Sequence, residues 1–270
     1  MQREGVRRRS RHGEGVSVGG ECLPPKRLRR DSTPLCGRNP KSPHIPPSEK
    51  GENMKKYILF DLDGTLTNSA PGIMNSLRYA FRHYNLPDMT DDELKQFVGP
   101  PLMVSFSQIL GFGEEKGLEA VGVYRQYFST KGLFENEVYK GIPEALEKLK
   151  NRGFTLAVST SKPEVYAKRI LEHFDLDKYF AEVCGIPLGD EGMTKAQVIA
   201  QTLEKLEVGD KSQVLMVGDR DYDVKGAFDN GIECMGVLYG YGDEKELGAA
   251  GAKYIAATVE EMAELICSLG

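Results

Sequence analysis

The sequence predicts an α/β fold: a doubly wound parallel sheet with helices on both faces, and an all-helical segment inserted after the first strand. Two observations carry this prediction. From Gly141 onward, short apolar runs alternate with helical periodicity, which is typical of parallel sheets with crossover helices. Between residues 71 and 130, apolar residues recur at helical spacing and no strand pattern is found. Apolar residues make up 40% of the chain, which is enough for a globular core.

The first predicted strand, residues 57–60, is an apolar run that ends in Asp61 and Asp63, followed by Gly64 and Thr65. Two carboxylates at the end of a buried strand are costly unless a partner compensates their charge. A divalent cation is the obvious partner, because Mg²⁺ prefers oxygen ligands, and Mn²⁺ accepts the same oxygens. The alternative is an ordinary acidic turn, in which Asp and Gly are common.

The inserted segment contains four predicted helices. Apolar residues at helical spacing place them within residues 73–84, 94–98, 102–110 and 118–128. Residues 99–101, with the sequence Gly-Pro-Pro, interrupt the pattern and form either a rigid loop that faces the site or a simple helix stop.

The second half of the chain alternates helices and strands. Pro143 opens the first of these helices, since proline is favoured in a first helical turn. Thr194 is the predicted N-cap of a later helix. The predicted strands span residues 154–159, 214–217, 232–238 and 253–255, and the further helices span 163–174, 194–206, 221–230 and 259–268.

Residues 1–53 differ from the rest of the chain in composition. They carry a net charge of +6, against −11 for residues 54–270, and contain no aromatic residue. Such a basic, polar segment cannot bury enough apolar surface to fold, so a disordered extension is predicted. A nucleic-acid-binding arm, a nuclear address and an organellar transit peptide are open alternatives. We expect translated leader sequence with Met54 as the native start, because residues 50–52, Lys-Gly-Glu, can be encoded by a ribosome-binding sequence.

Cysteine content, hydropathy and charge limit the cellular compartments and the binding partners that are expected. The five cysteines are scattered and form no C-x-x-C pair, which argues against a disulfide framework or zinc site and favours the reducing cytoplasm. No stretch approaches the ~20 apolar residues of a membrane span. The net charge of −11 in residues 54–270 repels phosphate backbones, so nucleic acid is not expected as a partner of this part. A monomer and a homodimer are both compatible with the sequence.

Four polar segments stand where a strand ends or a helix begins. In a doubly wound sheet, such points converge on one crevice at the carboxyl ends of the strands. The segments are Asp61-x-Asp63, then Thr160-Ser161-Lys162, then Lys195, and finally Gly218-Asp219 with Asp223.

The residue types suit phosphoryl chemistry. Asp61 can attack phosphorus and form an aspartyl phosphate. Asp63 can protonate the leaving oxygen and then take a proton from the attacking water. Asp219 can complete a Mg²⁺ site, with Asp223 alongside, and the cation lets an anionic nucleophile approach an anionic phosphate.

The phosphate itself needs donors. Thr160 and Lys195 can hold its oxygens by hydrogen bond and charge. Each residue alone has an ordinary alternative: a Thr after a strand is often a helix cap, and a Lys at a helix start is usually solvated. All four segments together, in this order, are hard to obtain by chance.

These motifs resemble those of the haloacid dehalogenase-like hydrolases, and the resemblance covers residues 55–268. It implies a Rossmann-like core formed by residues 54–70 and 139–270, with a helical cap at residues 71–138. It implies Asp61 as nucleophile and Asp63 as acid/base and backbone carbonyl ligand of Mg²⁺. Asp219 is the implied further metal ligand, and the implied supporting residues are Gly64, Thr65, Gly218 and Asp223.

Two positions depart from the family pattern. Ser161 stands where an Asn often follows the second-motif Thr. The third motif lacks the common Lys-Pro, so Lys195 is assigned as the phosphate-binding lysine and Lys162 is the fallback. With Thr160 and Ser161, Lys195 forms the expected phosphate-binding group.

The subgroup is indicated by three features. Asp63 separates the chain from the dehalogenases that name the family, which lack an acid there. The usual His of the sugar-phosphate mutases is absent after the first motif, at residues 69–72. Residues 97–102, and Tyr124-Arg125 with Phe128, resemble the phosphoglycolate phosphatase-like subgroup, which also contains 5′-nucleotidases.

The expected activity is therefore hydrolysis of a small phosphate monoester, with phosphoglycolate first and mononucleotides as the alternative. A sugar-phosphate mutase and an inactive binding protein stay open. The cap is expected to select the substrate, as mobile lids do. Arg125 and Lys131 are candidates for binding a distal anion, with a solvated helix face as the alternative, and Gly99 and Pro100 would belong to a rigid loop over the site.

Overall fold

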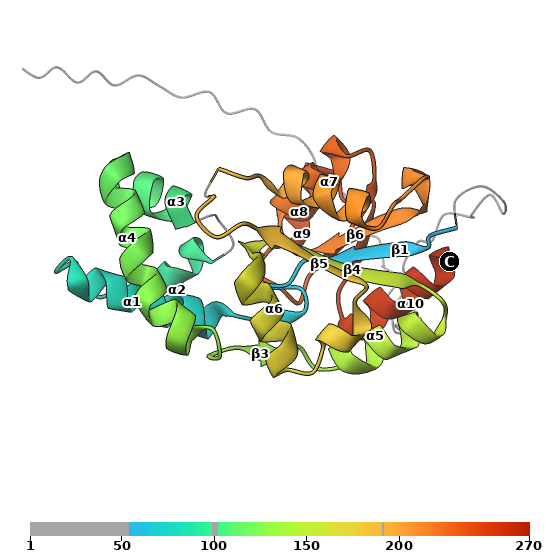
Figure 1. Cartoon of the computed structure of the whole chain (residues 1–270), viewed down its shortest axis with the longest axis horizontal. Helices are drawn as coiled ribbons and strands as arrows, with labels where there is room; N and C mark the ends of the chain where they lie inside the picture. The colour runs from blue at the N-terminus through green and yellow to red at the C-terminus, as the bar shows by residue number, and fades with distance from the viewer. Residues whose placement is uncertain (1–53, 99–101, 191) are drawn as a thin grey trace, which may run out of the picture. The chain divides into compact units, whose positions relative to one another are not determined.

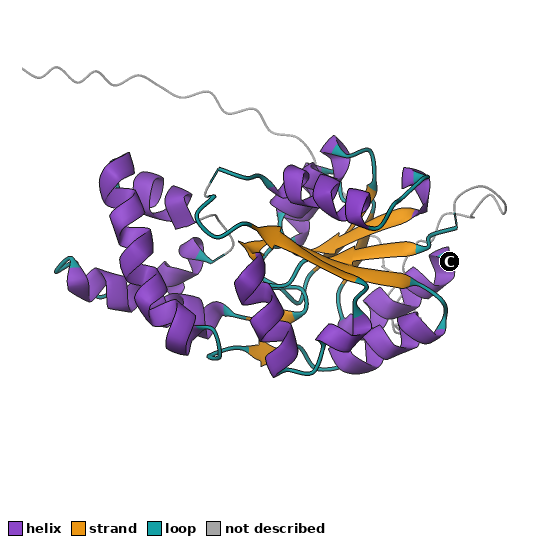
Figure 2. Cartoon of the chain, in the orientation of Figure 1, coloured by secondary structure: helices purple, strands orange, loops and turns teal. Residues whose placement is uncertain are grey.

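The computed structural model describes residues 54–98, 102–190 and 192–270. The predictions made for residues 1–53 and for Gly99 and Pro100 lie outside the described residues. A parallel sheet runs through the described part, with helices on both of its faces and a further group of helices beside it (Figures 1 and 2). Sheet and helices belong to one compact unit, Glu49–Gly270.

Six parallel strands form the sheet, in the order β5-β4-β1-β6-β7-β8. The strand β1 lies at the centre, where Tyr57 pairs with Thr155 on one side and with Val214 on the other. The chain winds first to one side of β1 and then to the other, which confirms the predicted doubly wound fold. The strands are β1 Tyr57–Phe60, β4 Thr155–Pro163, β5 Glu182–Ile186, β6 Val214–Gly218, β7 Glu233–Val237 and β8 Tyr254–Ala256.

Helices cover both faces of the sheet. Successive side chains of a strand point to opposite faces, and the central strands carry apolar side chains on both faces. Ile58 and Phe60 pack into one buried cluster, with α5 (Ile142–Asn151), α6 (Glu164–His173) and α10 (Val259–Leu269). Leu59 packs into the other, with α7 (Lys195–Lys205), α8 (Asp221–Asp229) and α9 (Glu244–Ala250). Two short 3₁₀ turns complete the sheet layer, η4 Asp177–Tyr179 and η5 Lys211–Gln213.

The inserted segment is helical, as predicted. Its first helix, α1, packs against α4, and Thr90 caps α2 through a capping box with Glu93. Its elements are α1 Ala70–His83, α2 Asp91–Leu94, η1 Lys95–Phe97, α3 Leu102–Val104, the π-helical turn η2 Ser105–Ile109, α4 Glu114–Tyr127 and the π-helical turn η3 Phe128–Gly132.

A two-stranded antiparallel ribbon joins the inserted segment to the sheet layer. The strand β2 (Thr67–Asn68) precedes α1, and β3 (Glu137–Val138) follows η3. Thr67 pairs with Val138 and Asn68 with Glu137, so the chain leaves and re-enters the sheet layer at adjacent positions. The ribbon was not predicted, and two residues of the predicted cap range form its second strand.

Two further elements were missed for local reasons. The strand β5 contains Gly185, which reads as a strand breaker, yet a Cβ there would lie 2.5 Å from the carbonyl oxygen of Lys162. Glycine is thus the residue that lets β5 lie close to β4. The helix α9 has only seven residues and buries Leu247 alone, so it shows no helical periodicity, although Asp243 caps it.

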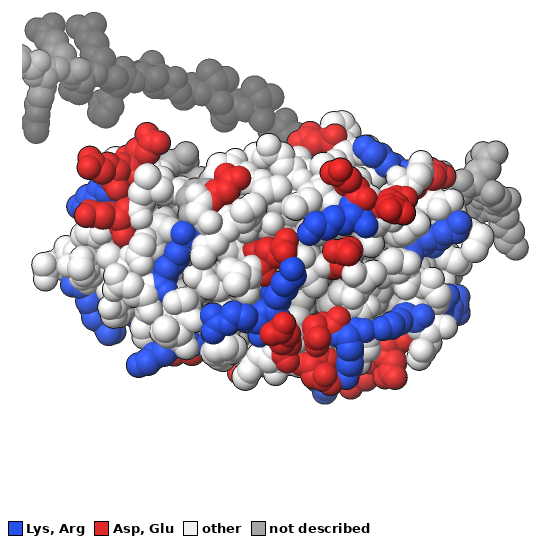
Figure 3. All heavy atoms as spheres, viewed as in Figure 1, with Lys and Arg blue, Asp and Glu red and all other residues white. Residues whose placement is uncertain are grey.

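Charged side chains of both signs are interspersed over the face of the described residues drawn in Figure 3. That face therefore has no continuous basic surface among its described residues. No helix in residues 54–98, 102–190 or 192–270 combines the length and the apolar character that crossing a bilayer requires.

Candidate active site

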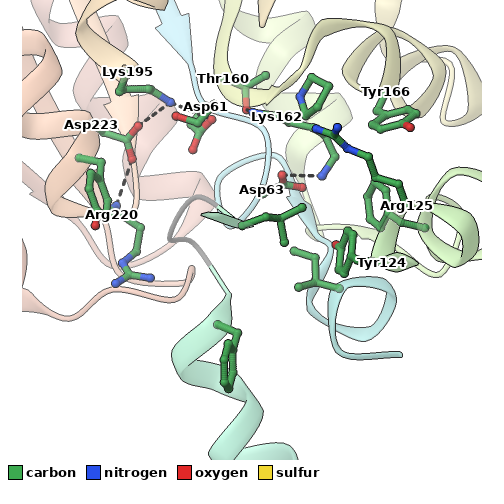
Figure 4. A pocket seen from close by; sticks show the side chains of 17 residues that line it. Asp61, Asp63, Tyr124, Arg125, Thr160, Lys162, Tyr166, Lys195, Arg220 and Asp223 are labelled. Carbon is green, nitrogen blue, oxygen red and sulfur yellow. Dashed lines mark hydrogen bonds and ion pairs between the residues drawn. The ribbon is translucent and has the colours of Figure 1, made fainter. Parts of the chain in front are cut away.

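The carboxyl ends of β1, β4 and β6 bring three of the predicted segments together. Asp61 follows β1, Thr160 lies in the last part of β4, and Asp219 follows β6. These strands are neighbours and parallel, so their ends meet at one edge of the sheet. The fourth segment arrives from α7, whose first residue is Lys195. Figure 4 shows Asp61, Asp63, Thr160, Lys162, Lys195 and Asp223 around one pocket.

Lys195 lies between two carboxylates. Its Nζ is 2.9 Å from Oδ1 of Asp61 and 2.7 Å from Oδ1 of Asp223. Burial acts to lower the pKa of Lys195, but the charges of Asp223 and Asp61 outweigh it and hold the pKa above its ordinary value. The ammonium is therefore charged and fixed at the edge of the sheet.

Asp219 is fully buried and is not among the described residues that line the pocket. Its Oδ1 accepts a hydrogen bond from the Thr65 hydroxyl at 3.2 Å, and its Oδ2 accepts one from the Tyr241 backbone N–H at 2.8 Å. Gly64 has a φ of +84°, and a Cβ there would lie 2.2 Å from Oδ2 of Asp219, so only glycine fits this turn. Burial, with the charges of Asp223 and Asp61, raises the pKa of Asp219 well above its ordinary value.

The carboxylates of Asp61, Asp219 and Asp223 gather around one point, each offering an oxygen within 4.8 Å of the others. Of the described lysines and arginines, Lys195 is the one that forms ion pairs with members of this cluster, so negative charge is left in excess. Burial and the charge of Asp61 raise the pKa of Asp223 to about 6, although Lys195 opposes them. Three crowded oxygens with excess negative charge fit a hard divalent cation.

Asp63 points to a different partner. Its Oδ2 lies 2.6 Å from Nζ of Lys162, whose side chain is 5% exposed, while the Asp63 side chain is 19% exposed. The Lys162 ammonium also lies over the ring of Phe128, 4.8 Å from its centroid. Lys195 and Lys162 were the two candidates for the phosphate-binding lysine. Both reach the pocket, where Lys195 pairs with Asp61 and Lys162 pairs with Asp63.

The smaller predicted residues lie between these charges. Thr160 and Ser161 both line the pocket, and the Thr160 hydroxyl accepts a hydrogen bond from the Lys162 backbone N–H at 3.2 Å. At Gly218 a Cβ would lie 2.2 Å from Cγ of Asp223, so the absence of a side chain lets Asp223 approach β6.

The opposite wall of the pocket comes largely from the inserted segment. Arg125 lines the pocket. Lys131 is not among the described lining residues and lies over the ring of Tyr127, 5.9 Å from its centroid. Most of the remaining lining side chains are apolar or aromatic: Ile73, Phe97, Leu102, Tyr124 and Phe128 come from the insertion, and Pro163, Tyr166 and Tyr222 come from the sheet layer.

Arg220 and Tyr241 are among the residues at the site that were not singled out from the sequence. Arg220 donates from Nε to Glu246 at 2.8 Å and from Nη1 to the carbonyl of Val98 at 2.9 Å, which links the sheet layer to the insertion. Its position directly after Asp219 is a signal that could have found it. Tyr241 contacts Asp219 from outside every motif, and no sequence signal marks it.

Comparison with known proteins gives the family. The family model of haloacid dehalogenase-like hydrolases matches residues 58–237. A 5′-nucleotidase of Pseudomonas aeruginosa is 41% identical over 77% of this chain and 94% of its own length. The tyrosine-protein kinase PtkA of Mycobacterium tuberculosis is 36% identical, over 81% of this chain and 75% of its own. A phosphoglycolate phosphatase of Vibrio parahaemolyticus is 29% identical, over 78% and 96%.

A solved structure agrees with these relatives. A protein of Clostridium acetobutylicum described as a predicted phosphatase is 45% identical, with a TM-score of 0.77, over 80% of this chain and 99% of its own. The resemblance predicted from the motifs is confirmed, and with it the class of phosphoric monoester hydrolase. The chain therefore belongs to the haloacid dehalogenase-like hydrolase family.

Proposed function

We propose that this protein hydrolyses a small phosphate monoester through an aspartyl phosphate on Asp61. One observation carries the proposal: Asp61 and Asp63 face the same pocket, and each is held by its own lysine. A nucleophile and an acid/base must both reach the phosphorus and its leaving oxygen. A protein that only bound phosphate would have no use for both carboxylates.

In the first half-reaction, a carboxylate oxygen of Asp61 attacks phosphorus and the bond from phosphorus to the leaving oxygen breaks. Asp63 donates a proton to that oxygen, so the product leaves as an alcohol. Lys195, Thr160 and Ser161 hold the phosphate oxygens and stabilise the charge that develops on them. For this step Asp63 must carry a proton.

In the second half-reaction, Asp63 takes a proton from a water molecule that attacks the aspartyl phosphate. The bond between phosphorus and Asp61 breaks, and inorganic phosphate is released. A Mg²⁺ ion bound by Asp61 and Asp219, with the backbone carbonyl of Asp63 and with Asp223 alongside, would reduce the repulsion between nucleophile and phosphate. Mn²⁺ suits the same oxygens.

We propose that the inserted segment, residues 71–138, acts as the cap that covers the substrate. Its side chains form most of the wall opposite the carboxylates, and Arg220 joins the two sides through the carbonyl of Val98. Closing such a segment removes water from the pocket and strengthens the charge interactions within it. Arg125 is the cation on this wall; it would pair with the distal anion of a substrate that has one, such as phosphoglycolate, and would face the nucleoside of a mononucleotide.

The wall favours mononucleotides over phosphoglycolate as substrates. Phe97, Tyr124, Phe128 and Tyr166 line this side of the pocket with aromatic side chains, whose apolar surface a nucleoside could cover. A two-carbon acid would leave this surface without a partner. The 5′-nucleotidase relative, at 41% identity, also resembles this chain more closely than the phosphoglycolate phosphatase relative, at 29%.

The described cysteines, Cys184, Cys234 and Cys267, are free thiols. This supports our proposal that the enzyme acts in a reducing compartment such as the cytoplasm.

The test measures phosphate release from 5′-mononucleotides, phosphoglycolate and sugar phosphates, with and without Mg²⁺. Asp61→Asn serves as the control, and a rapid acid quench followed by peptide mass analysis looks for phosphate on Asp61. We expect Mg²⁺-dependent release, the largest kcat/KM for a mononucleotide, and a phosphorylated Asp61 peptide during turnover.

Each part of the proposal can fail separately. Comparable release by Asp61→Asn would exclude the covalent route. Release without any phosphorylated Asp61 under quench conditions that trap a known aspartyl phosphate would also count against it. A clear preference for phosphoglycolate would reverse the substrate order, and interconversion of sugar phosphates without net release would make the protein a mutase.

A further inference from the structure

A short loop after β7 contacts both the buried carboxylate and the joint of the inserted segment. We call residues 239–241 the tyrosine loop. On one side it lies against Asp219: the Tyr241 N–H donates to Oδ2 at 2.8 Å. At Gly240, an added Cβ would lie 2.4 Å from Cβ of Asp219. The loop is thus packed directly on this carboxylate, with no space for a side chain between them.

On its other side the tyrosine loop reaches both chain crossings between the sheet layer and the insertion. The Tyr241 hydroxyl accepts a hydrogen bond from the Ala70 backbone N–H at 3.0 Å and donates one to Oδ1 of Asn68 at 3.2 Å. At the second crossing, the ring of Tyr239 packs against the ring of Tyr139, with centroids 5.2 Å apart.

The hydrogen bonds at the start of α1 show why Tyr241 matters there. A helix begins with N–H groups that have no partner inside the helix. Pro71 has no N–H, and the N–H of Gly72 donates to the carbonyl of Glu135 in the insertion itself. Ser69, the N-cap residue, makes no capping hydrogen bond with its side chain. The N–H of Ala70 donates to the Tyr241 hydroxyl at 3.0 Å and, over a longer distance of 3.4 Å, to Oδ1 of Asn68, so the shorter hydrogen bond that caps this helix comes from the sheet layer.

We infer that Tyr241 is a positioning residue that couples the carboxylate of Asp219 to the start of the inserted segment. The backbone N–H of Tyr241 is hydrogen-bonded to Asp219, so it should move with this carboxylate. The hydroxyl at the other end of the rigid tyrosine ring is hydrogen-bonded to Ala70, the first residue of α1. A change in the position of Asp219 therefore shifts the anchor of α1. The inference rests on the proposed function in one respect, that a cation at Asp219 is the physiological cause of such a change.

The experiment compares Tyr241→Phe with Tyr239→Phe in the full chain. Tyr241→Phe keeps the ring and the N–H bonded to Asp219 and removes only the hydroxyl. Tyr239→Phe is the matched control, because its hydroxyl contacts Sδ of Met262 and not the start of α1. Amide hydrogen exchange of residues 68–75 is measured without metal and over a Mg²⁺ titration, with Mg²⁺ affinity determined by calorimetry.

We expect Mg²⁺ to slow exchange at residues 68–75 in the wild type and in Tyr239→Phe. In Tyr241→Phe these amides should exchange on the order of fivefold faster without metal, because the N–H of Ala70 loses its shorter hydrogen bond and keeps only the longer one to Asn68. Added Mg²⁺ should no longer slow them, although its affinity stays within about threefold of the wild type, given that the backbone N–H is kept. KM for substrate should rise more than kcat falls, since the carboxylates are untouched.

Equal exchange in the two variants, with or without Mg²⁺, would overturn the coupling. So would a wild type that binds Mg²⁺ without any change at residues 68–75. A failure of the proposed function has a different signature: the wild type would bind no Mg²⁺ and release no phosphate. The metal-free comparison of the two variants would then still decide whether Tyr241 anchors α1.

Discussion

The two walls of the pocket are built on different principles. The wall at the edge of the sheet carries carboxylates and ammonium groups that are buried and paired, such as Lys195 with Asp61 and Asp223. The wall from the insertion carries aromatic rings, such as Tyr124 stacked on Phe128 at 5.4 Å. Charges placed by strand ends suit the step common to all phosphate esters, whereas rings placed by helices suit the part of the substrate that varies. We call the first the charged wall and the second the aromatic wall. Substitutions in the charged wall should alter the turnover rate and the stability of the protein, and substitutions in the aromatic wall should alter which substrate is preferred.

The largest effect is expected at the charged wall. Asp63→Asn should slow turnover by about 10²–10⁴-fold with every substrate, because it removes the proton donor and acceptor of both half-reactions. Steady-state and single-turnover phosphate release measure this loss. Asp92→Asn, which alters an exposed carboxylate on α2, is the control and should keep the wild-type rate. A rate loss confined to one substrate would place Asp63 in selection instead.

Removing the shared ammonium should destabilise the fold. Lys195→Met leaves Asp61 and Asp223 without their cation, and breaking a buried ion pair in this way costs about 3–5 kcal/mol of unfolding free energy. Lys162→Met is the matched change and should cost less, because its partner Asp63 is partly exposed to water, at 19%. Urea unfolding at neutral pH in the absence of Mg²⁺ gives both values. Equal losses of unfolding free energy would show that the two lysines contribute equally to the stability of the fold.

The charged wall should also make the metal-free protein sensitive to pH. The folded state holds a proton on Asp223 with a pKa of about 6, above the ordinary 3.8, so it binds more protons than the unfolded chain in this range. Stability is therefore highest below about pH 4 for this group and is lost as pH rises through about 6. The raised pKa of Asp219 acts in the same direction.

Mg²⁺ should consequently raise the melting temperature more at about pH 7.5 than at about pH 5, since a cation favours the ionised carboxylates. Thermal unfolding in chelator and in Mg²⁺, at both pH values, checks the sign. A larger effect at the lower pH would contradict the assignment of these carboxylates as a cation site.

The smallest effect is expected at the aromatic wall. Phe128→Leu should raise KM for a mononucleotide roughly tenfold, because it disturbs the aromatic lining in which Tyr124 stacks on Phe128, and leave kcat for small phosphate esters nearly unchanged. The control is Phe134→Leu, because Phe134 belongs to the same segment but is 38% exposed and packs on His173. An equal loss of kcat with all substrates would mean that the ring serves mainly to hold Lys162 in place.

The same contrast explains what the sequence could predict. Asp61, Asp63 and Asp219 follow apolar strands, and Thr160 lies late in one. Parallel strands bring their ends to one edge of the sheet, so the local sequence pattern was enough to place these residues. The third-motif lysine was ambiguous for a physical reason: Lys162 and Lys195 come from different elements and both reach the pocket.

The aromatic wall could not be read in this way. Phe97, Tyr124 and Phe128 recur at helical spacing, and such residues face either a core or a pocket with the same periodicity. Tyr241 depends on a hydrogen bond between residues 171 positions apart, which no local pattern contains. The strand β5 was missed because it contains Gly185. A glycine is needed there because the neighbouring strand β4 lies too close for a side chain, which the sequence does not show.

The antiparallel ribbon of β2 and β3 has a consequence for how this architecture can diversify. The insertion starts and finishes at paired residues, Asn68 with Glu137, and its ends are therefore as close as those of an ordinary hairpin turn. A foreign helical module whose own ends lie side by side could be spliced there while the registers of the six parallel strands stay as they are. Specificity could thus be exchanged as a cassette, provided that the new module keeps a backbone N–H in reach of the Tyr241 hydroxyl.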